Sequence, residues 1–197
     1  MEITAELVER VRNYAASQEK KKRFQHSLRV AETCRLMCTI YGEDPDRGYF
    51  AGLAHDICKD IDEKVMEELA GQDGYDLCEA EIKKPALLHG RAAAVVLKRD
   101  FGVDDEEILQ AVARHTLGCG NMCTLAKIVY AADKIEPGRP QSTDEYRENL
   151  FSMPVDDMVR AVLEENMEYL KQKGKKSSPL TMEFYKSVSD KKEMEGR

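Results

Sequence analysis

The stretch Phe50-Ala-Gly-Leu-Ala-His-Asp-Ile57 places an imidazole next to a carboxylate inside an otherwise apolar run. An acidic cap and a first-turn proline precede it, so the pattern predicts one helix from Asp44-Pro45 through Ile57, with the His-Asp pair deep inside it. Burying a lone ionised aspartate costs several kcal/mol unless another charge compensates it. A cation bound at His55 and Asp56 is the compensation that we expect.

Gly52 and Ala54 leave room for a neighbouring helix to approach this segment and bring further ligands. A long helix is predicted from about Lys20 to Tyr41, because the periodicity is helical and a glycine follows. His26 lies on the apolar face of this helix, whose other members are Val30, Thr33, Met37 and Ile40. A histidine on such a face is either a hydrogen-bonded core residue or a metal ligand.

Asp133 repeats the problem of a carboxylate on an apolar stripe, here with Ala126, Val129 and Ala132 in a helix predicted over residues 124–135. The alternative is a salt bridge to Lys134 or Arg139. Two buried aspartates and a buried histidine on three helices are better explained by one site with mixed nitrogen and oxygen ligands. The predicted metal ligands are His26, His55, Asp56 and Asp133.

The two remaining histidines fall at helix ends, His89 at the start of a helix over 89–100 and His115, with Thr116, at the end of one over 104–115. Both side chains can overhang a site between helices. They can bind a second metal ion, or neutralise phosphate oxygens and move protons. The sequence leaves both roles open.

Basic residues recur close to these positions. Arg29 follows His26 by three residues, Lys59 follows His55 by four on the same predicted helix face, and Arg139 follows Asp133. Together they would supply a local phosphate-binding field. The Lys20-Lys21-Lys22-Arg23 run opposes the dipole of its helix and is interpreted as a solvated face rather than a phosphate patch.

The whole chain favours an all-α fold with the metal site between helices of a bundle, since no alternating strand pattern occurs. Residues 71–84 are predicted as a loop with a brief helical piece, and the stretch from Lys173 onward as charged and partly loose. One domain is expected over residues 1–190, followed by a polar tail over 191–197. Further helices are predicted at about 4–17, 62–70, 143–152 and 154–172.

Composition excludes several classes of function. The 197 residues include 30 basic and 37 acidic side chains, and a net charge of −7 disfavours nucleic acid and anionic membranes as partners. No apolar run approaches the roughly 20 residues of a membrane span, and no signal peptide is evident, so we expect a cytoplasmic protein. The six cysteines are expected to be reduced thiols rather than disulfides or a zinc site.

In their order along the chain, the candidate residues resemble the HD-domain superfamily of metal-dependent phosphohydrolases, whose motif is a helix-borne histidine, a His-Asp pair and a distant aspartate. The fuller pattern is similar to the YqeK family, bacterial symmetrical hydrolases of diadenosine tetraphosphate, over about residues 20–185. The segments that carry this likeness are His26-Ser-Leu-Arg29-Val, Ala-His55-Asp56-Ile-Cys-Lys59-Asp, Leu-Leu-His89-Gly, Arg-His115-Thr116 and Ala-Asp133-Lys-Ile-Glu136-Pro-Gly-Arg139.

The resemblance implies an HD-type helical bundle that holds one or two iron ions, with Mn, Co or Mg as substitutes. It implies attack of a metal-bound hydroxide on a bridge phosphate, releasing two ADP molecules. Asp56, Lys59 and His89 would be catalytic. The substrate would contact His26, Lys59, His89, His115, Thr116, Asp133 and Arg139.

Near the C-terminus the chain departs from the family's Ile-His-Pro-x-Thr stretch, because it has Ser177-Ser178-Pro179-Leu180-Thr181. No substrate contact is carried over to that loop. The alternatives are an HD-type hydrolase of another nucleotide or phosphate ester, oxygen chemistry at a two-iron site, and a nucleotide sensor without turnover. The only expected partner besides the nucleotide is a second copy of the chain, since a homodimer is compatible with this pattern.

Overall fold

In the computed structural model, residues 2–189 are described, and they form α-helices joined by turns and one short 3-10 helix, with no strand among them. The predicted all-α fold is therefore confirmed. The helices are α1 (Ala5–Gln18), α2 (Lys21–Tyr41), α3 (Pro45–Ala54), α4 (Glu63–Ala70), α5 (Glu79–Lys83), η1 (Pro85–Leu88), α6 (His89–Phe101), α7 (Glu106–Arg114), α8 (Thr124–Ile135), α9 (Asp144–Phe151), α10 (Val155–Gln172) and α11 (Pro179–Ser189).

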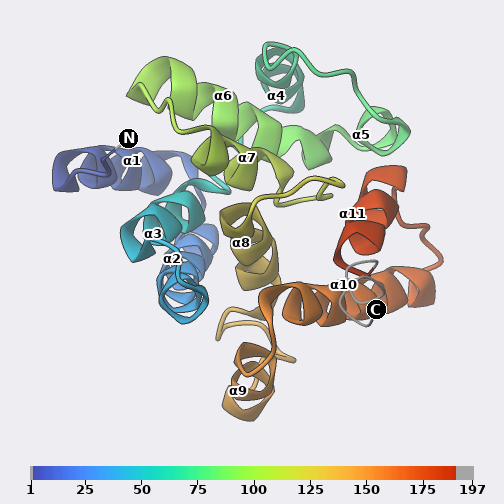
Figure 1. Ribbon diagram of the computed structural model, residues 1–197. Coiled ribbons are helices and arrows are strands. Elements are labelled where there is room, and N and C mark those ends of the chain that lie inside the picture. Colours follow the sequence, from blue (N-terminus) through green and yellow to red (C-terminus); the bar gives the residue numbers. More distant parts are fainter. Residues whose placement is uncertain (1, 190–197) are drawn as a thin grey trace.

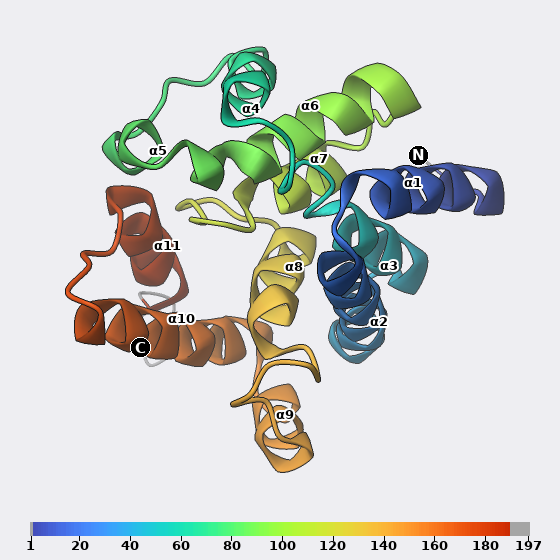
Figure 2. The ribbon, with the colours of Figure 1, turned by 180° about the vertical axis from the view of Figure 1, so that it is seen from behind.

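Helix α8 stands in the middle of the molecule, and the other helices surround it (Figures 1 and 2). Helices α2 and α3 pack together on one side of it, α6 and α7 lie across its beginning, and α10 and α11 lie on the opposite side. The core is mainly aliphatic, with Tyr130, Phe50 and Phe184 as its fully buried aromatic side chains. This arrangement brings the ends of several helices to the flank of α8.

Helix starts follow from side-chain caps that the sequence carries. The Thr4 hydroxyl accepts from the Leu7 amide, and the carboxylates of Asp44 and Asp62 accept from amides in the first turns of α3 and α4. Each cap satisfies a backbone N–H that has no partner inside its helix. At the other end of α2, Gly42 adopts a left-handed conformation with φ of 74° and ends the helix.

Helices α2 and α3 touch backbone to backbone at Gly52. A Cβ atom on this residue would lie 2.8 Å from the Ala31 Cα atom and 3.0 Å from the Cys34 sulfur, so only glycine fits. The close approach expected at this glycine is confirmed, because α2 is the helix that carries His26. The backbone contact sets how far the His26 ring lies from the end of α3.

Four expectations about the elements and their faces are wrong. Helix α3 ends at Ala54 rather than Ile57, because the backbone changes to turns in which Ile57 N donates to Ala54 O and Lys59 N to Asp56 O. The His-Asp pair therefore follows the helix instead of lying deep inside it, and Lys59 shares no helix face with His55. Residues 179–189 form α11 where a partly loose chain was expected, and Ile40 is 43% exposed rather than buried.

Other features of the chain agree with expectation. All six cysteines are free thiols, with Cys34 and Cys38 buried in α2. The brief helical piece expected within 71–84 is α5. None of the helices described is both long and apolar enough to cross a membrane. The polar tail predicted over 191–197 lies outside the described residues.

Candidate metal centre

Three of the four histidines are built into the molecule in the same way. Each one directly follows the end of a helix or lies at a helix junction, and its Nδ1 atom lies 2.7 Å from the backbone carbonyl oxygen three residues earlier. A carbonyl oxygen only accepts hydrogen bonds, so Nδ1 is the protonated nitrogen and Nε2 carries the lone pair. The three pairs are His55 with Gly52, His89 with Ala86 and His115 with Val112.

Two of these unprotonated nitrogens face each other beside a carboxylate. His89 Nε2 lies 2.9 Å from His115 Nε2, and Asp56 Oδ1 lies 3.0 Å from the former and 3.7 Å from the latter. These three atoms are acceptors, and all three side chains are buried. Three converging lone pairs repel one another unless a cation lies between them.

A second group of ligand atoms surrounds His55. Its Nε2 atom is buried without any hydrogen-bond partner, 3.7 Å from Asp56 Oδ2 and 3.8 Å from Asp133 Oδ1. His26 Nε2 lies 3.0 Å from the same Asp133 oxygen. His26, His55 and Asp56 offer atoms that all lie within 4.8 Å of one another, as do Asp56, His89 and His115. Asp56 belongs to both groups and joins them.

The pKa shifts put these side chains in the forms that bind metal. Burial lowers the pKa of His55 to about 4, and it also lowers the pKa values of His89 and His115. Burial opposes ionisation of Asp56, but neighbouring groups outweigh burial and its pKa is well below the usual value; the Arg23 guanidinium, 2.8 Å from Oδ2, is its charged donor. At neutral pH His55, His89 and His115 are therefore neutral and Asp56 is ionised, as metal ligation requires.

Asp133 is held by cations as well as by imidazoles. An Arg139 guanidinium nitrogen lies 2.7 Å from its Oδ1 atom, and Lys134 Nζ lies 3.4 Å from its Oδ2 atom. Burial opposes ionisation here too, but Lys134 and His26 outweigh it, so the pKa of Asp133 is well below the usual value. The salt bridges considered as the alternative for this residue exist alongside its contacts with the histidines.

His26 differs from the other three histidines in what holds it. Its Nδ1 atom lies 3.0 Å from Glu136 Oε1, and no carbonyl of its own helix contacts the ring. Burial lowers the pKa of His26, but the bonds with Asp133 and Glu136 outweigh burial and leave the pKa above its ordinary value. Glu136, which sequence analysis did not single out as a site residue, therefore adjoins the candidate centre and holds one of its histidines.

The predicted basic residues have different positions. Lys59 Nζ lies 3.0 Å from His89 Nδ1 and 3.3 Å from His89 Nε2, so this ammonium group covers the ring, and burial lowers its pKa. Arg139 binds both the carbonyl and the carboxylate of Asp133. Arg29 binds Glu136 instead of facing the ligand cluster.

Arg23 is a site residue that sequence analysis missed. One of its guanidinium nitrogens lies 2.8 Å from Asp56 Oδ2, and its Nε atom lies 2.8 Å from Asp60 Oδ2. The rest of the Lys20–Arg23 run is exposed, as expected for a solvated face. Because Arg23 precedes His26 by three residues, it shares that residue's helix face, which is the signal that identifies it.

Contacts among the loops fix the ends of α6 and α7. The Thr116 hydroxyl donates to Leu87 O at 3.3 Å, and Lys134 Nζ donates to His115 O at 3.1 Å. A Cβ atom on Gly90 would lie 2.7 Å from Val112 O and 2.9 Å from His115 Nδ1, so α6 and α7 meet here without room for a side chain. The 177–181 stretch, for which no substrate contact was predicted, is also held in place, because Thr181 Oγ1 donates a hydrogen bond to Leu117 O.

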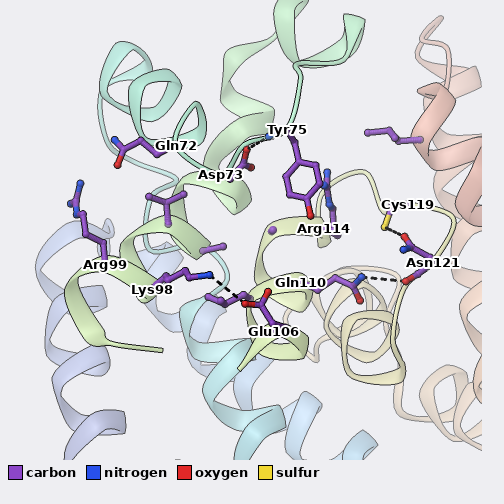
Figure 3. A pocket seen from close by; sticks show the side chains of 15 residues that line it. Gln72, Asp73, Tyr75, Lys98, Arg99, Glu106, Gln110, Arg114, Cys119 and Asn121 are labelled. Carbon is purple, nitrogen blue, oxygen red and sulfur yellow. Dashed lines mark hydrogen bonds and ion pairs between the residues drawn. The ribbon is translucent and has the colours of Figure 1, made fainter. Parts of the chain in front are cut away.

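A groove of about 740 Å³ lies elsewhere, between α6 and α7 and the segment that follows α4 (Figure 3). None of the clustered histidines and aspartates lines it. Its charged side chains interact with neighbours: Lys98 bonds Glu106, and the Arg114 guanidinium lies 4.7 Å from the centre of the Tyr75 ring. The candidate chemistry is therefore in the buried cluster and not in this groove.

Comparison with known families shows which family the chain belongs to. The HD domain matches residues 23–138, a segment that contains all four histidines, Asp56 and Asp133. The chain belongs to the HD-domain family. The HD domain is a metal-dependent phosphohydrolase domain that binds divalent metal ions, which agrees with the fold and the ligand cluster described above.

Individual HD proteins are similar over much of the chain. The symmetrical bis(5'-nucleosyl)-tetraphosphatase of Staphylococcus aureus is 36% identical over 67% of this chain and 68% of that protein. Its namesake from Halalkalibacterium halodurans is 35% identical over 59% of this chain and 62% of its own length. A crystal structure titled as a predicted HD superfamily hydrolase involved in NAD metabolism, from Clostridium acetobutylicum, superposes with a TM-score of 0.85 at 30% identity, covering 93% of this chain and 97% of the other.

Proposed function

We propose that this HD protein hydrolyses diadenosine tetraphosphate symmetrically, giving two ADP molecules. The observation that carries the proposal is the convergence of unprotonated imidazole nitrogens and ionised carboxylate oxygens, edged by Arg23, Lys59 and Arg139. Two similar HD proteins carry the name of this activity. A polyphosphate needs local positive charge, which the chain places at this site despite its net charge of −7.

The ligand set fits two divalent ions that share one carboxylate. His26, His55 and Asp133 would hold one ion, His89 and His115 the other, and Asp56 would lie between them. Four imidazoles favour a transition metal over magnesium, so we propose iron as the resident metal, with Mn, Co or Mg as substitutes. Such ions supply Lewis acidity and lower the pKa of a bound water.

The protein's own side chains bind and orient the substrate. Lys59 Nζ, held over His89, donates hydrogen bonds to oxygens of the phosphate under attack, where negative charge increases in the transition state. Arg23 and Arg139 already bind Asp56 and Asp133, so their remaining N–H groups contact the flanking phosphates without losing those bonds. The burial of the cluster excludes bulk water and strengthens each of these interactions.

The test is product analysis with purified protein reconstituted with Fe²⁺ or Mn²⁺. We expect ion-exchange chromatography to find ADP as the only product from diadenosine tetraphosphate. In H₂¹⁸O, one ADP of each pair should carry the label, because water attacks one of the two central phosphorus atoms. Formation of ATP and AMP would contradict the symmetrical cleavage. An intact substrate would contradict the hydrolase and favour a nucleotide sensor.

A further inference from the structure

Glu136 is buried next to the metal centre but is not within its ligand cluster. Its side chain is 2% exposed and lies just after the last residue of α8. The carboxylate accepts from His26 Nδ1 at 3.0 Å, from two nitrogens of Arg29 and from the Gly138 amide. A buried carboxylate with this many donors is ionised, and Arg29 and His26 keep its pKa below the usual value although burial opposes this.

The position of His26 in its helix explains why a distant side chain is needed. His55 and His115 follow helix ends, where carbonyl oxygens have no partner inside the helix and are free to accept from a ring. His26 lies in the first half of α2, where the helix's own hydrogen bonds use the carbonyls. Its Nδ1 proton therefore requires an acceptor from another part of the chain.

The segment after α8 is shaped to deliver that acceptor. Gly138 packs against Arg29, and a Cβ atom there would lie 2.5 Å from the Arg29 Nε atom. Its amide and the Arg29 guanidinium hold Glu136 from two directions, so the carboxylate has one orientation. Because a carboxylate only accepts, His26 Nδ1 keeps its proton toward Glu136, and Nε2 is directed at Asp133, where a bound cation would take the place of its proton.

We propose that Glu136 is a positioning residue, which fixes the ring orientation and tautomer of His26 and so determines how tightly the ion beside His55 is bound. The inference deepens the proposed function, since it rests on His26 being a metal ligand. Carboxylates that accept from a metal-bound histidine raise its basicity, and their loss costs about 10–100-fold in metal affinity. The His89 and His115 half of the centre has no contact with Glu136 among the described residues.

The experiment is a Co²⁺ titration of the metal-free protein, followed by its d–d absorption bands and by elemental analysis. Glu136→Ala should lower the binding affinity for one of the two Co²⁺ ions about 10–100-fold and shift the absorption bands of that ion. The other ion should bind as in the wild type. Glu136→Gln should lose less Co²⁺ affinity than Glu136→Ala, because the glutamine amide oxygen still accepts a hydrogen bond from His26 Nδ1. The matched control is Glu32→Gln. Glu32 is an exposed glutamate on α2, the helix of His26, and pairs with Arg35. This variant should bind both ions with unchanged affinity.

Nitrogen NMR of the imidazoles in the metal-free protein gives a readout that does not depend on turnover. Wild-type His26 should keep a proton on Nδ1, and Glu136→Ala should lose that proton in favour of Nε2, which faces the Asp133 carboxylate. If Glu136→Ala is folded by circular dichroism and binds both ions with wild-type affinity and spectrum, the positioning role is wrong and the proposed hydrolysis stands. If the wild type binds no Co²⁺, the metal centre itself is overturned, and this inference with it. If Glu136→Ala does not fold, Glu136→Asp decides, because its shorter side chain draws the carboxylate away from His26 Nδ1: unchanged affinity, bands and tautomer overturn the role.

Discussion

The two halves of the metal centre are oriented by different means. His89 and His115 are held by carbonyls three residues away in their own chain segments. His26, by contrast, is held by Glu136, which is 110 residues away in the sequence. His89 and His115 are thus set by local backbone geometry, as is His55 in the other half, whereas His26 is set by a contact between distant segments. Substitutions far from the ligands should therefore disturb the His26 half more readily than the His89 half.

The largest effect on metal content and activity is expected at Asp56, which belongs to both groups of candidate ligands. Asp56→Asn removes the carboxylate charge shared by both groups, so both ions should be lost and hydrolysis of diadenosine tetraphosphate should fall by about a thousandfold or more. Elemental analysis and kcat measure this. Asp60→Asn is the matched control, because Asp60 also binds Arg23 but touches no histidine in the hydrogen bonds of the described residues. Asp56→Asn with wild-type metal content would show that the halves are independent.

Removing one ligand from each half should separate them. We expect two metal ions per chain in the wild type and one in either His26→Gln or His115→Gln, with kcat falling about a hundredfold in both because each ion supplies charge to the same phosphate. Metal content per chain and steady-state rates are the measurements. Equal metal content in wild type and His115→Gln would mean that His115 contacts the phosphate rather than an ion.

A smaller effect on activity is expected from replacing Lys59, whose ammonium group covers the His89 ring. Lys59→Gln should lower kcat/KM for diadenosine tetraphosphate about 10–100-fold without changing metal content, because one donor to the transferring phosphate is lost. Lys64→Gln, at an exposed position in α4, serves as the control. Loss of metal in Lys59→Gln would instead assign Lys59 to the support of His89.

The smallest effect concerns stability on the His26 side. Burial raises the pKa of Glu19 to about 7, and its carboxylate accepts from Ser27, the neighbour of His26. Between the unfolded value of 4.5 and about 7, the unfolded chain is ionised at this residue while the folded one is protonated, so stability falls as pH rises through this window. Glu19→Gln should therefore raise the melting temperature by a few degrees at pH 8 and leave it nearly unchanged at pH 4.5. An equal change at both pH values would contradict the shifted pKa.

Much of the centre could be predicted from single residues and their spacing. Carboxylates in apolar surroundings indicated Asp56 and Asp133 as candidate ligands, and helix start and stop signals placed His89 and His115 at helix ends. The geometry brings all of these residues together. Their roles as metal ligands and substrate contacts stay predictions that the variants above test.

What sequence analysis missed depends on contacts between distant segments. Periodicity continues through Ile57, so nothing local showed that α3 ends at Ala54 and frees the Gly52 carbonyl for His55. The importance of Glu136 depends on a helix that passes 110 residues earlier in the chain. Helix α11 gains its stability from packing Phe184 against Tyr130 and Gly118, which a charged sequence alone does not indicate.

The contact at Gly90 has a consequence for how such a protein can diverge. A single methyl group at this position would strike both the donor and the acceptor of the bond that orients His115. An alanine there changes no charge and no candidate ligand, so a comparison of the candidate site residues alone would not detect it. We therefore expect glycine to be retained at residue 90, and an alanine there to disturb the orientation of His115 although every candidate metal ligand is still in place.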